Sequence, residues 1–132
     1  MLIIFVGDKP SAKNVDPKIP FIGTESGKRL RRWITMLTTE LAIKGIEAKF
    51  LTFNSHTDEE LENIRKNSEG NALIVTLGEQ ATKRVTRKLK LPVWKLGHPS
   101  PRNRQWNNYN KEVDEIKKLA YYIIKKELNE KQ

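Results

Sequence analysis

Short apolar stretches alternate with longer stretches of helical periodicity, and this alternation limits the possible folds more than any other feature. Residues 2–6 are continuously apolar and rich in β-branched side chains, and a glycine follows at once. An uninterrupted run of this kind is typical of a strand that is buried on both faces of a parallel sheet. Residues 72–77 have the same character and also end in glycine. Such strands need helices on both sides of the sheet to cover them.

The remaining elements follow the same order along the chain. Residues 47–53 alternate between apolar and polar and predict a strand, and residues 92–96 predict a short fourth strand. Apolar side chains three and four positions apart predict the helices, because that spacing places them on one face. We expect helices over residues 25–44, 58–67, 79–89 and 109–128, and polar loops over residues 7–24 and 97–108. This order predicts an α/β fold, a single three-layer α/β/α domain over residues 1–132 with a four-stranded, mostly parallel sheet.

The composition excludes several kinds of site. The 132 residues contain no cysteine, which excludes a disulfide scaffold, a thiolate zinc site, a cysteine-ligated iron–sulfur cluster and a cysteine nucleophile. With only two histidines, His56 and His98, we expect neither a metal nor a cofactor. No apolar stretch approaches the ~20 residues of a membrane-spanning helix, and no signal peptide is recognisable. We therefore expect an intracellular protein, and we expect it to be a monomer.

The net charge of +9 is concentrated in one quarter of the chain. Residues 79–104 carry eight basic side chains and a single acidic one, Glu79, whereas residues 55–78 carry two basic and five acidic side chains. Neutralisation of phosphates dominates the affinity of proteins for nucleic acids, so a clustered basic patch favours a DNA partner. The alternative is a solvated basic face that serves solubility alone.

A polar segment rich in glycine, proline or small side chains follows each predicted strand. These segments cover residues 7–11, 53–56, 78–80 and 97–101. Parallel strands bring their carboxyl ends to one edge of the sheet, which is where ligands bind in open α/β folds. We therefore expect a functional site at this edge.

These segments together resemble motifs of the uracil-DNA glycosylase superfamily. Residues 7–11, GDKPS, resemble the first, water-activating motif, and residues 98–103, HPSPRN, resemble the second motif in its single-strand-selective monofunctional form. Residues 19–23, IPFIG, resemble the Pro-Phe-Val-Gly segment of the family 4 enzymes. Residues 72–81, ALIVTLGEQA, resemble the third strand of that family and its Leu-Gly-x-x-Ala turn. The resemblance runs from about residue 2 to residue 108, with the motifs in the expected order.

The resemblance implies a glycosylase that hydrolyses the bond between an extruded base and its sugar in DNA. It implies that Asp8 positions the hydrolytic water and that His98 donates a hydrogen bond to a carbonyl oxygen of the departing base. In other branches an Asp or Asn one position later does the work of Asp8, and here that position is Lys9. Phe21 matches the aromatic residue that stacks on the base, and Asn54 matches the asparagine that reads its pairing edge. The iron–sulfur cysteines of family 4 are absent.

Each of these assignments has a plainer alternative. Phe21 can fix its loop to the core, and Asn54 is also a common turn residue. Asp8 can cap its loop through backbone N–H groups, and a lone histidine such as His98 is often structural. We group Lys9 with the base-binding residues. Its alternatives are a phosphate contact and a lyase nucleophile that forms a Schiff base with the sugar.

Serines, prolines and basic side chains near these loops are expected to hold the DNA backbone. Hydroxyl and backbone N–H groups bind phosphates, prolines stiffen loops, and phosphate contacts position DNA without reading its sequence. We assign DNA contacts to Pro10, Ser11, Lys83, Arg84, Ser100, Pro101, Arg102, Asn103 and Arg104. For Trp106 two interpretations stay open, stacking on a base and a hydrophobic latch beneath the last helix.

The sequence thus predicts a metal-free, monofunctional glycosylase that releases a uracil-type base from single- or double-stranded DNA. A second hypothesis is a catalytically silent relative that binds DNA or a modified base without turnover. A third is a nucleotide-binding α/β protein, but no glycine-rich phosphate-binding fingerprint is present.

Overall fold

Four parallel strands form the centre of the molecule in a computed structural model, which describes residues 1–9, 24–100 and 102–130. The strands are β1 (Leu2–Val6), β2 (Lys49–Phe53), β3 (Ala72–Leu77) and β4 (Trp94–Leu96). Their order in the sheet is β2-β1-β3-β4, and every pairing between them is parallel. The predicted sheet is therefore confirmed.

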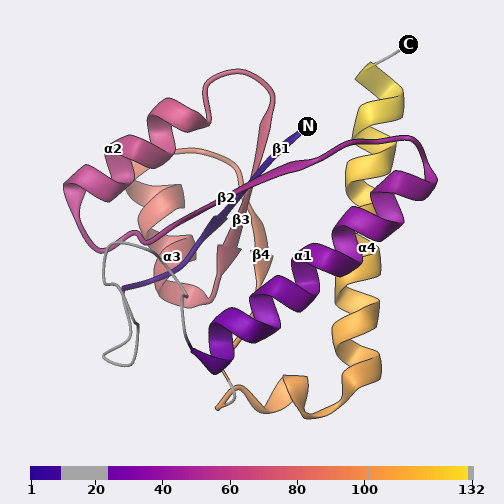
Figure 1. Cartoon of the computed structure of the whole chain (residues 1–132). Coiled ribbons are helices and arrows are strands. Elements are labelled where there is room, and N and C mark those ends of the chain that lie inside the picture. Colours follow the sequence, from indigo (N-terminus) through magenta and orange to yellow (C-terminus); the bar gives the residue numbers. More distant parts are fainter. Residues whose placement is uncertain (10–23, 101, 131–132) are drawn as a thin grey trace.

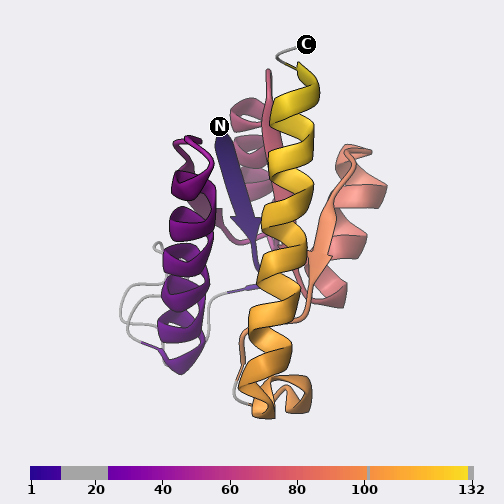
Figure 2. The same ribbon diagram turned by 90° about the vertical axis from the view of Figure 1, so that its right-hand side faces the viewer.

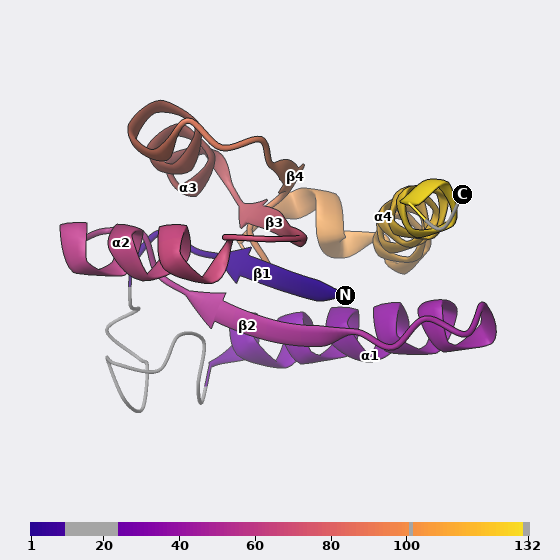
Figure 3. The ribbon, with the colours of Figure 1, turned by 90° about the horizontal axis from the view of Figure 1, so that it is seen from above.

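Helices cover both faces of this sheet. Helices α1 (Glu25–Ile43) and α4 (Tyr109–Glu130) lie on one face, and α2 (Asp58–Asn67) and α3 (Glu79–Arg84) lie on the other (Figures 1 and 3). Figure 2 shows α4 in front of the sheet, with α1 beside it. The predicted three-layer α/β/α architecture is confirmed. Among the described residues, no helix combines the length and the apolar character that a membrane span requires.

The apolar run of β1 supplies both halves of the core. Successive side chains of a strand point to opposite faces, so a central strand covered on both sides must be apolar at every position. Ile3 and Phe5 pack with α1 and α4, whereas Ile4 and Val6 pack with α2 and α3. All four side chains are fully buried.

The structure differs from the predicted elements in the basic helix and in the last loop. The helix predicted over residues 79–89 ends as an α-helix at Arg84 and continues as one π-helical turn, Val85–Leu89. Val85 is fully buried and Leu89 packs against the same apolar cluster, so both ends of the wider turn face the core. The segment predicted as a loop after β4 contains a 3₁₀ helix, Arg104–Asn107.

Candidate active site

Asp8 and Asn54 lie on neighbouring segments at the carboxyl edge of the sheet. Hydrogen bonds continue beyond the paired strands: the Gly7 amide donates to the Phe53 carbonyl at 2.8 Å, and the Ser55 amide donates to the Asp8 carbonyl at 3.0 Å. The two segments that leave β1 and β2 therefore stay side by side for two further residues. The predicted convergence of these two loops is present.

Ser55 and Asn54 form the buried floor of this part of the edge. The Ser55 hydroxyl donates to the Gly7 carbonyl at 2.7 Å, and only 1% of Ser55 is exposed. Asn54 is 3% exposed. Its side-chain amide carries both donors and an acceptor, so it can pair with a ligand that reaches this edge.

The guanidinium group of Arg84 holds Asp8 in place. Its Nη1 donates to Asp8 Oδ1 and, at 3.2 Å, to the Asp8 carbonyl oxygen, and it also lies 3.5 Å from Ser55 Oγ. The Arg84 and Asp8 side chains are 28% and 30% exposed. Sequence reasoning grouped Arg84 with the phosphate contacts of its helix and did not foresee this ion pair. The two residues are 76 positions apart in the sequence, so no local sequence pattern predicts that they pair.

The other basic residues of this segment point outward. Lys83, Arg87 and Lys88 are exposed, as the prediction of a surface that steers DNA requires. Lys9 is also exposed. Arg84 is therefore distinguished from its basic neighbours by its contact with Asp8.

His98 lies at the end of β4, close to the end of β3. Gly78 follows β3 with a φ of +97°, and a Cβ added there would lie 3.4 Å from the His98 Cβ. The positive φ and the close approach both favour glycine at this position. The Gly78 amide donates to the Leu96 carbonyl at 2.8 Å, which joins the two segments just before His98.

The imidazole of His98 is held in its neutral form. Its Nδ1 accepts a hydrogen bond from the Ser100 amide at 3.0 Å, so the proton of the neutral ring resides on Nε2. Burial lowers the pKa of His98 below that of an exposed histidine, and the negative charge of Asp8 offsets part of this effect. Asp8 and His98 are therefore close enough for one charge to act on the other, and they form the centre of the candidate site.

Trp106 is a latch beneath the His98 loop. Its indole Nε1 donates to the His98 carbonyl at 2.8 Å, and the residue is only 3% exposed. Its ring packs edge-on against Trp33 of α1, with 5.1 Å between the centroids. Of the two interpretations of Trp106, the structure therefore favours the hydrophobic latch.

The polar residues of this loop also serve its own conformation. The side-chain Nδ2 of Asn103 donates to the His98 carbonyl at 3.1 Å, and the Ser100 hydroxyl accepts from the Arg102 backbone amide at 3.1 Å. Arg102 and Arg104 are exposed. Of the predicted contacts in the described part of this loop, the two arginines are thus the most open to a DNA backbone.

Several predicted site residues fall outside the described part of the chain. These are Phe21, Pro10, Ser11 and Pro101. Among the residues that are described, no group of three or more His, Asp or Glu side chains is arranged to hold a metal ion.

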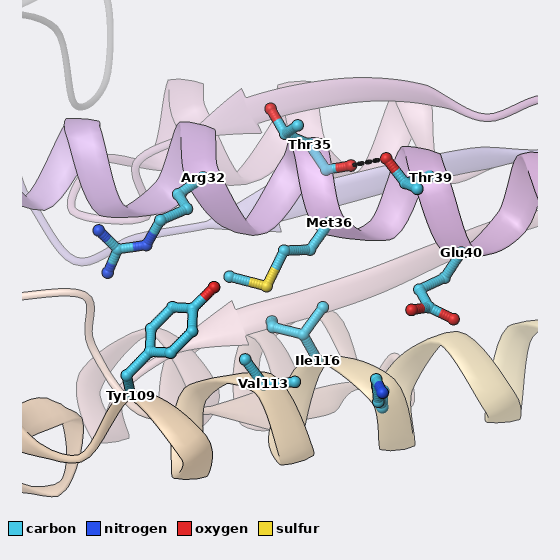
Figure 4. Close-up of a pocket in the computed structure, with 9 residues that line it drawn as sticks. Arg32, Thr35, Met36, Thr39, Glu40, Tyr109, Val113 and Ile116 are labelled. Atoms are coloured by element: carbon cyan, nitrogen blue, oxygen red, sulfur yellow. Dashed lines mark hydrogen bonds between the residues drawn. The ribbon is translucent and has the colours of Figure 1, made fainter.

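A hollow of about 560 Å³ opens beside the end of β4 and is lined by His98, Gly78 and Lys111, among others. Another hollow, of about 290 Å³, lies away from this centre, between α1 and α4 (Figure 4). Met36 and Ile116 give this groove an apolar floor, and it includes none of the residues that converge at the strand ends.

Sequence reasoning missed a buried acid behind the His98 loop. Glu112 of α4 is only 2% exposed. It precedes Ile116, Leu119 and Ile123 by four, seven and eleven positions, so it lies on the same helical face as these buried residues. A charged residue inside an apolar stripe is the signal that would have revealed it.

Comparison with known proteins gives one match. The family model described as the uracil DNA glycosylase superfamily matches residues 2–121, which is most of the chain. No curated protein and no solved structure matches the chain significantly.

Proposed function

The chain belongs to the uracil-DNA glycosylase superfamily, and from this premise we propose that it is a monofunctional glycosylase acting on a uracil-type base in DNA. Within the superfamily, its motifs resemble both family 4 and the single-strand-selective branch. The observation that carries the proposal is the placement of Asp8 directly after β1 and of His98 after β4, at the same carboxyl edge of the parallel sheet. This pair supplies a carboxylate and a neutral N–H donor, the two groups that hydrolysis of an N-glycosidic bond requires.

In the proposed reaction, His98 stabilises the departing base. As the bond between C1′ and the base nitrogen breaks, the electron pair stays with the base and negative charge develops on its carbonyl oxygens. The neutral ring of His98 carries its proton on Nε2 and can donate it in a hydrogen bond to such an oxygen. A donor held in advance at this position contributes about 3 kcal/mol to lowering the barrier. The bond from the Ser100 amide to Nδ1 supports this role, because it fixes the tautomer.

Asp8 is proposed to act on the sugar side of the same bond. Its carboxylate would orient a water toward C1′ and stabilise the positive charge that develops on the sugar. The water oxygen then bonds to C1′, and the proton that it releases balances the charge of the departing base. Arg84 supports this role, because its contacts with the Asp8 carboxylate and carbonyl fix the side chain in one orientation.

The base and the DNA backbone are proposed to meet the remaining residues of this edge. The side chain of Asn54, a buried residue directly after β2, would pair with the edge of a flipped base. Phe21 and Lys9 would complete the base-binding part. The exposed Lys83, Arg102 and Arg104 would contact phosphates, together with the loop residues Pro10, Ser11, Ser100, Pro101 and Asn103.

The direct test is release of uracil from end-labelled oligonucleotides. Single strands with one uracil, and duplexes with uracil opposite G or A, are incubated with the protein and treated with alkali to cleave abasic sites. We expect cleavage by the wild type and a loss of about 100-fold or more in both Asp8→Asn and His98→Ala. The matched controls are Asp114→Asn and His56→Ala, which change exposed residues of the same types. Equal cleavage by Asp8→Asn and Asp114→Asn would contradict the assignment of Asp8.

A catalytically silent DNA-binding relative is the second candidate, and the ion pair between Arg84 and Asp8 favours it. A carboxylate already bound by a guanidinium has less capacity to hold a water molecule. Under this proposal the protein binds uracil-containing DNA stoichiometrically and in a salt-dependent manner, with no abasic site formed by any substrate. The same oligonucleotides, examined by binding and by alkali treatment, distinguish the two candidates.

A further inference from the structure

Three successive carbonyl groups of the His98 loop accept hydrogen bonds, one from the 3₁₀ helix and two from α1. The His98 carbonyl accepts from Trp106 Nε1 at 2.8 Å, as described above. The next two carbonyls, of Pro99 and Ser100, both accept from Arg29 Nη1, at 3.3 and 3.2 Å. Arg29 belongs to the second turn of α1, so a helix far away in the sequence determines the path of this loop.

Glu112 anchors the groups that hold these carbonyls. Its Oε1 lies 3.4 Å from Arg29 Nε and accepts from Trp33 Nε1 at 2.8 Å. Trp33 in turn packs against Trp106. Two routes therefore connect one buried carboxylate to the loop, one through Arg29 and the other through the two tryptophans.

Arg32 binds the same carboxylate without reaching the loop. Its Nη2 donates to both oxygens of Glu112, at 2.7 and 3.0 Å. Its guanidinium carbon lies 5.9 Å from the centre of the Tyr109 ring, at the end of the groove between α1 and α4 (Figure 4). Arg29 and Arg32 thus share an anion, but only Arg29 also contacts the backbone of the His98 loop.

We propose that Arg29 and Glu112 are positioning residues of the active site, which fix the His98 loop so that the imidazole keeps its tautomer and its place beside Asp8. The inference rests on the proposed glycosylase function for its catalytic consequence. The Ser100 amide that fixes the tautomer belongs to the residue whose carbonyl Arg29 holds. Loss of Arg29 would therefore release both the loop and the hydrogen bond to Nδ1.

The test compares Arg29→Gln with Arg32→Gln. Both variants remove one guanidinium from Glu112, so both weaken the contact between α1 and α4, but only Arg29→Gln removes the donor to the loop. The first measurement uses the protein alone: ¹⁵N spectra of His98 report its tautomer, and hydrogen exchange reports the protection of the Ser100 amide. We expect a mixture of tautomers and loss of this protection in Arg29→Gln, and spectra like those of the wild type in Arg32→Gln.

The second measurement is single-turnover release of uracil at saturating protein. We expect a fall of about 10- to 100-fold in the rate for Arg29→Gln, with DNA affinity changed less than threefold, because a small displacement of a catalytic group has effects of this size. Arg32→Gln should stay within threefold of the wild type. Glu112→Gln should resemble Arg29→Gln, because a neutral amide holds a guanidinium less firmly.

The outcomes separate this inference from the proposed function. If the wild type releases no base from any substrate, the glycosylase proposal fails, and the spectra of His98 still decide whether Arg29 positions the loop. If Arg29→Gln and Arg32→Gln change the spectra and the rate equally, the contact with the loop has no special role and the inference is overturned. If Arg29→Gln leaves the His98 tautomer unchanged, it is likewise overturned.

Discussion

The two halves of the candidate site are supported in opposite ways. The Asp8 side depends on Ser55 and on one ion pair with Arg84, whose partners are both more than a quarter exposed. The His98 loop accepts hydrogen bonds from Trp106, Asn103 and Arg29. The buried Glu112 carboxylate lies behind these contacts. The difference indicates a fixed imidazole beside a carboxylate whose partner can be exchanged.

The partly exposed ion pair of Asp8 and Arg84 is the part of the site that we expect DNA to alter. Water and salt screen charges that are partly exposed, and a phosphate can compete for a guanidinium in such a position. The Glu112 carboxylate is only 2% exposed and is shielded from both, although its partner Arg32 is 46% exposed. The following predictions test this contrast, beginning with the largest effect.

Removal of the buried carboxylate should cost the most stability. Glu112→Ala leaves Arg29, Arg32 and the Trp33 indole without their shared acceptor, and we expect a loss of about 3 kcal/mol or more in the free energy of unfolding. Glu115→Ala is the control, because among the described residues Glu115 pairs only with the exposed Lys118, and the change should cost less than about 1 kcal/mol. Urea unfolding measures both. Similar losses of unfolding free energy in the two variants would show that Glu112 supports the His98 half no more than a surface ion pair would.

Removal of Arg84 should affect chemistry more than stability. Because its ion pair is partly exposed, Arg84→Gln should cost less than about 1 kcal/mol of unfolding free energy. The rate of uracil release at saturation should change by about 10-fold or more, because the orientation of Asp8 is lost. The control Arg87→Gln removes an exposed charge of the same segment and should weaken DNA binding and its salt dependence without changing the saturated rate. Identical behaviour of the two variants would place Arg84 among the phosphate contacts.

Replacement of Trp106 by phenylalanine should weaken the His98 loop without unfolding the protein. The aromatic packing against Trp33 is partly kept, but the N–H bond to the His98 carbonyl is lost. We expect a loss of about 1 kcal/mol, because the side-chain Nδ2 of Asn103 still donates to the same carbonyl. The measurements are urea unfolding and the exchange rate of the Ser100 amide. A gain in stability would contradict the role of the indole as a latch.

The smallest effect expected is a dependence of stability on pH through His98. Burial lowers the pKa of this residue in the folded state, so the unfolded chain takes up the proton first as the pH falls. The contribution is therefore complete above the pKa of an unfolded histidine, about 6.5, and is lost progressively below it. Between pH 7 and pH 5, wild-type stability should fall more steeply than that of His98→Gln. The variant His56→Gln, at an exposed position, should keep the wild-type slope.

The sequence is sufficient to predict the sheet and its edge. Runs of apolar residues that end in glycine predict β1 and β3, because central parallel strands have no solvated face. The polar segments after the strands predict where Asp8, Asn54 and His98 meet, since parallel strands share a carboxyl edge. The π-helical turn after Arg84 is not predictable in this way, because residues 79–89 have the periodicity of an ordinary helix.

The sequence also does not predict ion pairs between residues that are far apart in the chain. Arg84 and Asp8 are 76 residues apart, and Arg32 and Glu112 are 80 apart. Arg84 lies on a basic helix, so the sequence alone favours a phosphate contact for it, and only the structure shows its acidic partner. Trp106 was equally undecided, because an indole suits a base and a core alike.

The contact between α1 and α4 through Glu112 has a consequence for the order in which parts of the site form during synthesis. The Glu112 carboxylate leaves the ribosome long after β1, β2, β3 and α1, so a nascent chain can assemble the Asp8 half of the edge before the His98 half has its support. Contacts between such distant segments also form late when a complete chain folds, because closing a long loop costs entropy. Under the proposed function, the support of the His98 loop should accordingly be the last part of the site that a newly synthesised molecule acquires.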